Sequence, residues 1–139
     1  MVKTAYDYPI QTGYGCLKGY PINKQMCDKP GYGFHRGVDR PMPRRTPIVL
    51  NNVQIGLSGM TGFVTGPHLH IGKWGPNGVM NPTDDSRFFS KGSKIIAVNH
   101  NAAADTLNGK YVKVRSAKTG YVWVFLHMDR VDVAVGQTL

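Results

Sequence analysis

Glycine and proline interrupt this chain so often that long helices are excluded. The sequence of 139 residues contains 17 glycines and 9 prolines, scattered along its length. Both residue types destabilise helix interiors and favour tight turns between short strands. With 41% hydrophobic and 18% charged residues, the chain is expected to fold rather than to remain disordered. We therefore predict an all-β fold with little helix, built as a single compact domain over residues 1–139.

Short apolar segments with alternating patterns indicate where the strands of this fold lie. Such segments predict an antiparallel sheet, because turn residues separate neighbouring segments by only a few positions. The one candidate for a short helix or coil is the segment 86–91, and residues 99–108 are expected to form a loop. The predicted strands are 35–40, 46–50, 53–59, 68–71, 94–98, 111–115, 121–126 and 131–137.

Histidine dominates the residues that could carry chemistry. His35 is followed four positions later by Asp39, and His68 is followed two positions later by His70. On strands, residues at these spacings lie on the same face, so each pair can converge on one ion. A catalytic zinc site uses such side chains as three protein ligands and leaves a fourth position open. The sequence therefore predicts a zinc hydrolase.

The chain contains no glutamate, which constrains the kind of zinc chemistry. A glutamate base of the H-E-x-x-H type is excluded, so histidine is left as the proton shuttle. His127 follows an apolar segment and is a candidate for this role, although a histidine at the end of a buried strand is the alternative. His100 lies in a polar loop and is not expected to belong to the site.

The two histidine motifs resemble those of a known family. The segment 35–39 matches an H-x-x-x-D motif, and Thr65-Gly66-Pro67-His68-Leu69-His70 contains an H-x-H motif. In this combination they resemble the motifs of the lysostaphin-like zinc endopeptidases, which hydrolyse peptide bonds in bacterial peptidoglycan. The resemblance extends over nearly the whole chain.

The resemblance implies a role for each of the five candidate residues. It implies that His35, Asp39 and His70 bind Zn²⁺, and that His68 and His127 are the catalytic histidines beside the metal. It also implies that the antiparallel sheet forms a groove with zinc at its floor. The expected substrate is bacterial peptidoglycan, either its stem peptide or its cross-bridge.

The order of sequence blocks departs from the family pattern. In the family, the block that ends in the additional catalytic histidine lies between the two zinc motifs, whereas here the blocks follow as 1–50, 51–90 and 91–139. Three explanations remain open: a rearranged gene, an arrangement in which the last block docks from a neighbouring chain, or an unusual recombinant sequence. The role of His127 depends on the last block folding beside the site.

Charge and cysteine content add expectations about partners. A net charge of +9 favours polyanions, namely nucleic acid, anionic membranes or a cell wall that bears teichoic acid. No nucleic-acid-binding motif accompanies this charge, so a specific nucleic-acid partner is not expected. Cys16 and Cys27 either form a disulfide or remain two thiols. We expect the aromatic side chains of Tyr14, Tyr32, Phe34 and Trp74 to line the groove, and core packing is an equal explanation for Phe34.

The leading hypothesis is therefore a zinc endopeptidase that degrades the bacterial cell wall. No apolar stretch approaches the length of about 20 residues that spans a bilayer, and the N-terminus lacks the pattern of a signal peptide. These features suit a phage lytic or virion-associated enzyme, or a secreted enzyme whose signal has been removed. The alternative is a catalytically silent wall-binding or scaffold domain that retains the same fold.

Overall fold

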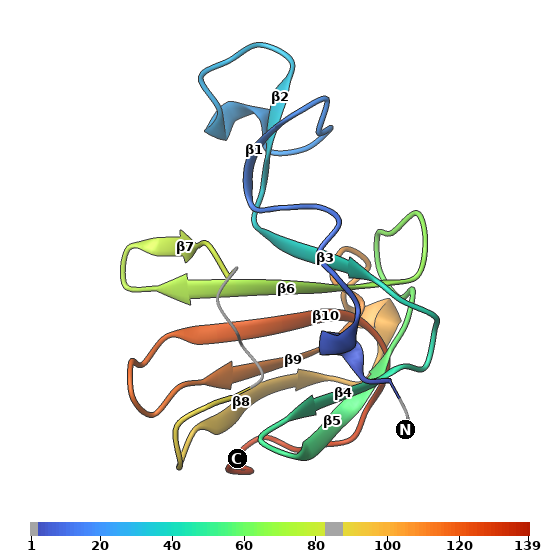
Figure 1. The fold of residues 1–139 in the computed structure, drawn as a ribbon, viewed down its shortest axis with the longest axis vertical. Helices are drawn as coiled ribbons and strands as arrows, with labels where there is room; N and C mark the ends of the chain where they lie inside the picture. The colour runs from blue at the N-terminus through green and yellow to red at the C-terminus, as the bar shows by residue number, and fades with distance from the viewer. Residues whose placement is uncertain (1–2, 83–87) are drawn as a thin grey trace.

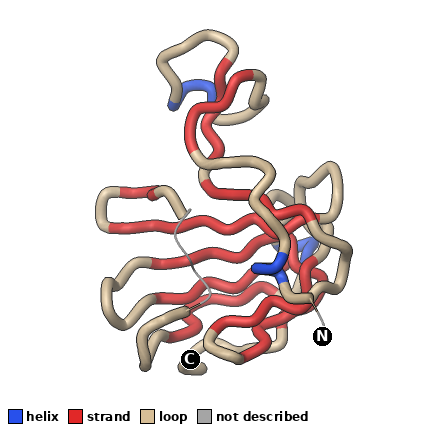
Figure 2. The backbone as a smooth tube through the Cα atoms, viewed as in Figure 1, coloured by secondary structure: helices blue, strands red, loops and turns tan. Residues whose placement is uncertain are grey.

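The computed structural model describes residues 3–82 and 88–139, and strands dominate this part of the chain (Figures 1 and 2). The only helices among the described residues are three short 3-10 helices, so the predicted all-β fold with little helix is confirmed. These helices are η1 (Ala5–Asp7), η2 (Lys24–Met26) and η3 (Ala102–Ala104). The strands are β1 (Gly15–Lys18), β2 (Tyr32–His35), β3 (Gly37–Pro41), β4 (Pro47–Leu50), β5 (Val53–Ser58), β6 (His68–Gly75), β7 (Gly78–Met80), β8 (Lys94–Asn99), β9 (Lys110–Arg115) and β10 (Val122–Val131).

The long strand β10 organises the main antiparallel sheet of eight strands. On one side it pairs with β9 from Val122 to Met128. On the other side its first half pairs with β6 and its second half pairs with β5. Strand β3 pairs with the outer edge of β6, and β4 pairs with the outer edge of β5. The sheet thus combines strands from all three sequence blocks, and the last block provides its centre in the same chain.

A bulge interrupts β10 at His127. The pairing register shifts there against β9, between Phe125 and Met128, and His127 has a φ of 63°. A positive φ is uncommon for residues other than glycine, although histidine, like asparagine and aspartate, is enriched among the exceptions. A bulge of this kind redirects a side chain relative to the regular alternation of a strand. The predicted strand 121–126 is therefore observed, but it continues through the histidine.

The predicted strand 131–137 is wrong over most of its length. Only Val131 belongs to a strand, as the last residue of β10, and the chain then turns. Gly136, with a φ of 94°, lies in this turn, and its amide donates to the carbonyl of Ile95. The segment after Val131 thus contacts the sheet through single hydrogen bonds, and it does not pair with a neighbouring strand along its length.

Burial alternates along β6 as its sequence predicts. Leu69 and Ile71 are buried in the core, whereas His68 and His70 lie on the opposite face and remain partly exposed. The same core contains side chains from most other strands of the main sheet. Its largest fully buried members are Phe125, Ile48, Leu50, Ile55, Leu69, Ile71, Ile95 and Met128.

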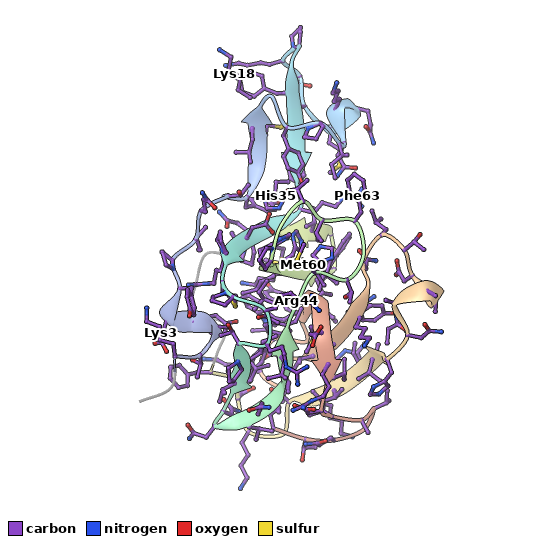
Figure 3. All side chains as sticks on the ribbon, turned by 90° about the vertical axis from the view of Figure 1, so that its right-hand side faces the viewer. Lys3, Lys18, His35, Arg44, Met60 and Phe63 are labelled. Atoms are coloured by element: carbon purple, nitrogen blue, oxygen red, sulfur yellow. A yellow bond between two sulfur atoms is a disulfide. The ribbon has the colours of Figure 1, made fainter. Side chains whose placement is uncertain are left out.

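The β1–β2 hairpin projects from the main sheet (Figure 1). A view turned by 90° shows the same projection, with Lys18 near its outer end (Figure 3). A disulfide joins Cys16 and Cys27 within this hairpin, which decides between the two alternatives left open by the sequence. A cross-link across a loop of this size contributes about 2–3 kcal/mol in the chain-entropy model. The hairpin therefore has a covalent constraint in addition to its strand pairing.

The predicted helix or coil at 86–91 lies partly outside the described residues. Its remaining residues, 88–91, are not helical. No helix in the described part of the chain has the length and apolar character needed to span a membrane.

Candidate active site

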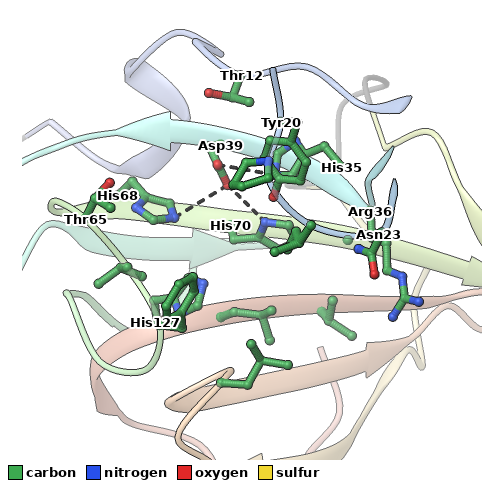
Figure 4. A pocket seen from close by; sticks show the side chains of 18 of the residues that line it. Thr12, Tyr20, Asn23, His35, Arg36, Asp39, Thr65, His68, His70 and His127 are labelled. Atoms are coloured by element: carbon green, nitrogen blue, oxygen red, sulfur yellow. Dashed lines mark hydrogen bonds and ion pairs between the residues drawn. The ribbon is translucent and has the colours of Figure 1, made fainter. Parts of the chain in front are cut away.

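Pairing between β3 and β6 brings the two histidine motifs together. Asp39 is the register partner of His70, and the preceding strand β2 ends at His35. The three residues lie on neighbouring strands, and the dashed lines of Figure 4 connect them through the Asp39 carboxylate. The local sequence produces this arrangement because the side chains alternate along each strand.

The spacing of the ligand atoms suits a metal ion. One ligand atom from each of His35, Asp39 and His70 lies within 4.8 Å of the others. The Nε2 atom of His35 is 3.3 Å from Oδ2 of Asp39, and the Nδ1 atom of His70 is 2.9 Å from Oδ1 of Asp39. In a tetrahedral zinc site with ligand bonds of about 2.0–2.1 Å, two ligand atoms lie about 3.3 Å apart. The group could therefore hold a metal ion with small adjustments of the side chains.

The electrostatics of the group favour an ionised carboxylate. Burial raises the pKa of Asp39, but the hydrogen bonds with His35 and His70 outweigh burial and hold this pKa well below its usual range. The pKa of His35 is raised overall, because its hydrogen bond with Asp39 and the carboxylate charge together exceed the lowering effect of burial. At neutral pH the group thus includes an anionic oxygen ligand, which favours binding of a divalent cation.

Backbone carbonyls fix the orientation of three imidazoles. The Nδ1 atoms of His35, His68 and His127 lie 2.7, 2.9 and 2.8 Å from the carbonyl oxygens of Gly13, Gly66 and Thr61. Because a carbonyl can only accept, Nδ1 carries the proton in each ring, and Nε2 is left for a metal or a proton. Such carbonyl partners are typical of histidines at metal sites.

His35, Asp39 and His70 are called the metal-binding group below, because together they could hold a metal ion. The two predicted catalytic histidines lie beside this group. The ring centroids of His68 and His127 are 5.1 Å apart, and those of His70 and His127 are 6.1 Å apart. His68 Nε2 lies 3.6 Å from Oδ1 of Asp39. The structure therefore brings all five predicted residues together. The last sequence block folds beside the site, as a role for His127 requires. By contrast, His100 is exposed and does not line the pocket, as expected.

His127 is held in its neutral form. Burial lowers the pKa of His127 to about 4; the charges of His68 and His70 act in the same direction, and the hydrogen bond with Thr61 opposes them. The ring is 7% exposed, which explains the dominance of burial. At neutral pH this imidazole is therefore uncharged.

Thr61 connects His127 to two other segments. Its carbonyl accepts from the His127 ring, and its hydroxyl donates to the carbonyl of Met128 at 2.7 Å. The same hydroxyl accepts from the amide of Lys110 at 2.9 Å. Gly109 packs so closely that an added Cβ would lie 2.4 Å from Thr61 Oγ1. This junction fixes the loop that precedes His68 against the bulge that presents His127.

We expect Thr61→Val to loosen this junction. Valine has the same shape but leaves the Met128 carbonyl and the Lys110 amide without this partner, which should lower the free energy of unfolding by about 1–3 kcal/mol. Urea unfolding measures this change, and nitrogen NMR of the imidazoles should show a second environment for His127. Thr61→Ser retains the hydroxyl and should behave like the parent chain. Equal stability of the valine and serine variants would contradict the role of the hydroxyl.

A glycine is required at position 37 because the backbones of β3 and β6 approach each other closely there. A Cβ at this position would lie 2.2 Å from the carbonyl oxygen of Ile71 and 2.6 Å from Nε2 of His70. A backbone atom cannot move aside as a flexible side chain can. The glycine of the H-x-x-x-D motif therefore has a packing function next to the metal-binding group.

Gly37→Ala should consequently separate the two strands. We expect the free energy of unfolding to fall by about 1–3 kcal/mol, as for other overpacked sites. Gly13→Ala is the matched control, since no atom lies within 4 Å of a Cβ built there and its φ is not in the left-handed region. Denaturant unfolding of both variants measures the difference. A Gly37→Ala variant as stable as Gly13→Ala would show that the strands can adapt.

A pocket of about 720 Å³ opens above the histidines. Trp74 lines it, as the sequence analysis expected, but Tyr14, Tyr32 and Phe34 do not. Tyr14 and Phe34 instead pack edge to face, with ring centroids 5.2 Å apart. The prediction was wrong for Tyr14 and Tyr32, and for Phe34 packing rather than groove lining is observed, because composition alone does not show which strand face meets the pocket.

The loop between Cys16 and Cys27 in the β1–β2 hairpin supplies one wall of this pocket. Tyr20 lines the pocket and its ring centroid lies 5.1 Å from that of His35. Burial and the charge of Asp39 both raise the pKa of Tyr20, so its hydroxyl remains protonated. Phe63 and Leu107 come from two further loops, and they also line the pocket with 67% and 59% of their surface exposed.

Comparison of the chain with protein-family models, with curated proteins and with solved structures found no match. The resemblance to the lysostaphin-like family thus rests on the motifs quoted above.

Proposed function

We propose that this protein is a zinc-dependent endopeptidase that hydrolyses peptide bonds in bacterial peptidoglycan. The observation that carries the proposal is the convergence of His35, Asp39 and His70, with ligand atoms within 4.8 Å of one another, beside two further histidines at the floor of a pocket. A structural metal site is closed by protein ligands, whereas a catalytic site keeps one position for substrate or water. Three ligands beside a pocket of this size fit the catalytic class.

The donor set fits zinc. Two imidazole nitrogens and one carboxylate oxygen are common zinc ligands, and the ligand spacing agrees with a tetrahedral site. His35 would bind through Nε2 and His70 through Nδ1, because these are the atoms directed at Asp39. When bound, zinc supplies a Lewis acid that polarises a carbonyl and lowers the pKa of the attacking water.

The remaining histidines would handle protons. Nδ1 of His68 is held by the Gly66 carbonyl, so Nε2 is the atom that can accept a proton from water. His127 is neutral and lines the pocket, where its Nε2 atom can accept a hydrogen bond from a water and orient it. In the absence of any glutamate, these two imidazoles are the available proton carriers.

Peptidoglycan is proposed as substrate because of the motif resemblance, and the pocket supports this choice. An open pocket lined on two sides by exposed loops accommodates an extended peptide. The positive net charge of the chain would favour association with an anionic cell wall. We propose that the enzyme acts at the bacterial cell wall, as a phage lytic or virion-associated enzyme or as a secreted one.

Removal and replacement of the metal test this function. Purified cell walls should lose turbidity when the protein is added, this loss should stop after treatment with EDTA, and about one equivalent of zinc should restore it. Magnesium serves as the control, because it prefers six oxygen ligands and should not restore hydrolysis. Hydrolysis that continues undiminished after chelation would refute a zinc-dependent reaction.

A further inference from the structure

The pocket carries one permanent positive charge. Apart from the histidines, its charged lining residues are Arg36 and Asp39. The Asp39 carboxylate is engaged with His35 and His70 at the metal-binding group. The guanidinium of Arg36 is therefore the charge in the pocket that is left available to a ligand.

Arg36 has a fixed backbone and an uncommitted head group. It follows the buried His35 and precedes Gly37, which packs tightly on β6. The contact recorded for its guanidinium is with Sδ of Met26, at 3.7 Å. Within residues 3–82 and 88–139, no carboxylate pairs with it. A thioether sulfur is a weak acceptor, so a carboxylate of a ligand could displace this contact at little cost.

The remaining walls of the pocket offer few charged contacts. Large apolar side chains contribute much of them, namely Ile22, Phe63, Trp74 and Leu107, each of which is exposed. Apolar walls accept many peptides with similar affinity, whereas a single cation selects strongly for an anion. A guanidinium can bind a carboxylate through two parallel hydrogen bonds, which adds geometric selectivity.

Arg36 lies at a definite place relative to the metal-binding group. Figure 4 shows Arg36 and Asn23 beyond His70, on the side away from His68 and Thr65. Arg36 directly follows His35 in the chain and lines the same pocket as His35, Asp39 and His70. A ligand bound beside these three residues would therefore lie close to the Arg36 guanidinium.

We infer that Arg36 determines substrate specificity by binding a free carboxylate of the peptide close to the bond that is cut. This inference rests on the proposed peptidase function and deepens it. Stem peptides carry such carboxylates on side chains and at chain ends, whereas a bridge made of glycine alone is neutral along its length. The geometry thus favours a carboxylate-bearing stem peptide over a glycine bridge.

Matched peptides test the inference. One pair differs only in an internal glutamate or glutamine, and a second pair differs only in a C-terminal carboxylate or amide, with the position varied from one to three residues on each side of the cleaved bond. The zinc-loaded full chain is assayed for kcat/KM on each peptide. Binding of the same peptides is measured by calorimetry without added metal, so that affinity is obtained independently of hydrolysis.

The variants Arg36→Gln, Arg36→Lys and Arg115→Gln are compared with the parent chain. Arg115 is exposed and does not line the pocket, so it is the matched control. The parent should prefer one carboxylate peptide over its neutral partner by about tenfold, as one charge-assisted contact gives. Arg36→Gln should abolish this preference by weakening the carboxylate peptide alone, Arg36→Lys should retain part of it, and Arg115→Gln should leave it unchanged.

The outcomes separate this inference from the proposed function. Whichever pair shows the preference identifies an internal or a terminal carboxylate as the group bound. Equal affinity and kcat/KM for both members of each pair, or an equal loss on both in Arg36→Gln, would overturn the role of Arg36 while hydrolysis still supports a peptidase. If no peptide is cleaved but the preference for carboxylate in binding depends on Arg36, the peptidase function falls and Arg36 is a carboxylate-binding residue of a non-catalytic pocket.

Discussion

Asp39→Ala should reduce bound zinc from about one equivalent per chain to nearly none at micromolar free metal, and cell-wall hydrolysis should disappear with it. Asp39 supplies the anionic ligand, and its carboxylate contacts both His35 and His70. Two neutral imidazoles alone form a much weaker site. Metal analysis after dialysis, together with the turbidity assay, measures both effects. We expect the loss in hydrolysis to exceed about a thousandfold.

The backbone around Asp39 should survive this change. Its amide and carbonyl bond to the backbone of Thr12 and Gln11, and neither bond involves the side chain. Asp132→Ala is the matched control, since Asp132 pairs with Arg130 outside the pocket. The control should retain zinc and activity. Full zinc occupancy in Asp39→Ala would disprove the predicted ligand set.

His68→Ala should separate metal binding from catalysis. The three predicted ligands remain in place, so zinc should stay bound, whereas turnover should fall by about a hundredfold to ten-thousandfold, the usual contribution of general acid–base catalysis. For His127 the better substitution is His127→Asn, because asparagine tolerates the positive φ that His127 adopts. It should also retain zinc and lose activity on a similar scale.

His100→Ala is the control for both variants, as His100 is exposed and outside the pocket. Hydrolysis by His68→Ala at the rate of this control would contradict a catalytic role for His68. If neither His68 nor His127 affected hydrolysis or its zinc dependence, a wall-binding or scaffold domain of the same fold would become the better explanation for the motifs.

The predictable part of the site is the part encoded by local alternation. His68 and His70 alternate with Leu69 and Ile71, so a strand at this position places both histidines on one face whatever it pairs with. The prediction for these residues needed no knowledge of the fold. The same holds for His35 and Asp39, although the break between β2 and β3 at Arg36 was not foreseen.

His127 could be placed only through tertiary structure. It follows β6 by more than fifty positions and reaches the site through a bulge, which the sequence does not mark. Simple alternation along β10 would direct the His127 side chain away from the pocket, and the bulge turns it toward the pocket. Thr61 was part of a quoted motif, but only the structure shows its contacts with Met128 and Lys110. The pocket wall formed by the disulfide-bonded hairpin depends likewise on long-range packing.

The central position of β10 has a consequence for the timing of activity. Strands β5 and β6 leave the ribosome before β10, yet each of them pairs with it. A nascent chain that ends before residue 122 therefore lacks the middle of its sheet and one of its histidines. Pairing of such distant segments is slow, and it requires synthesis of the chain through β10. The five histidine and aspartate residues of the proposed site therefore come together only after β10 has been translated, so that synthesis itself would delay any activity of this site.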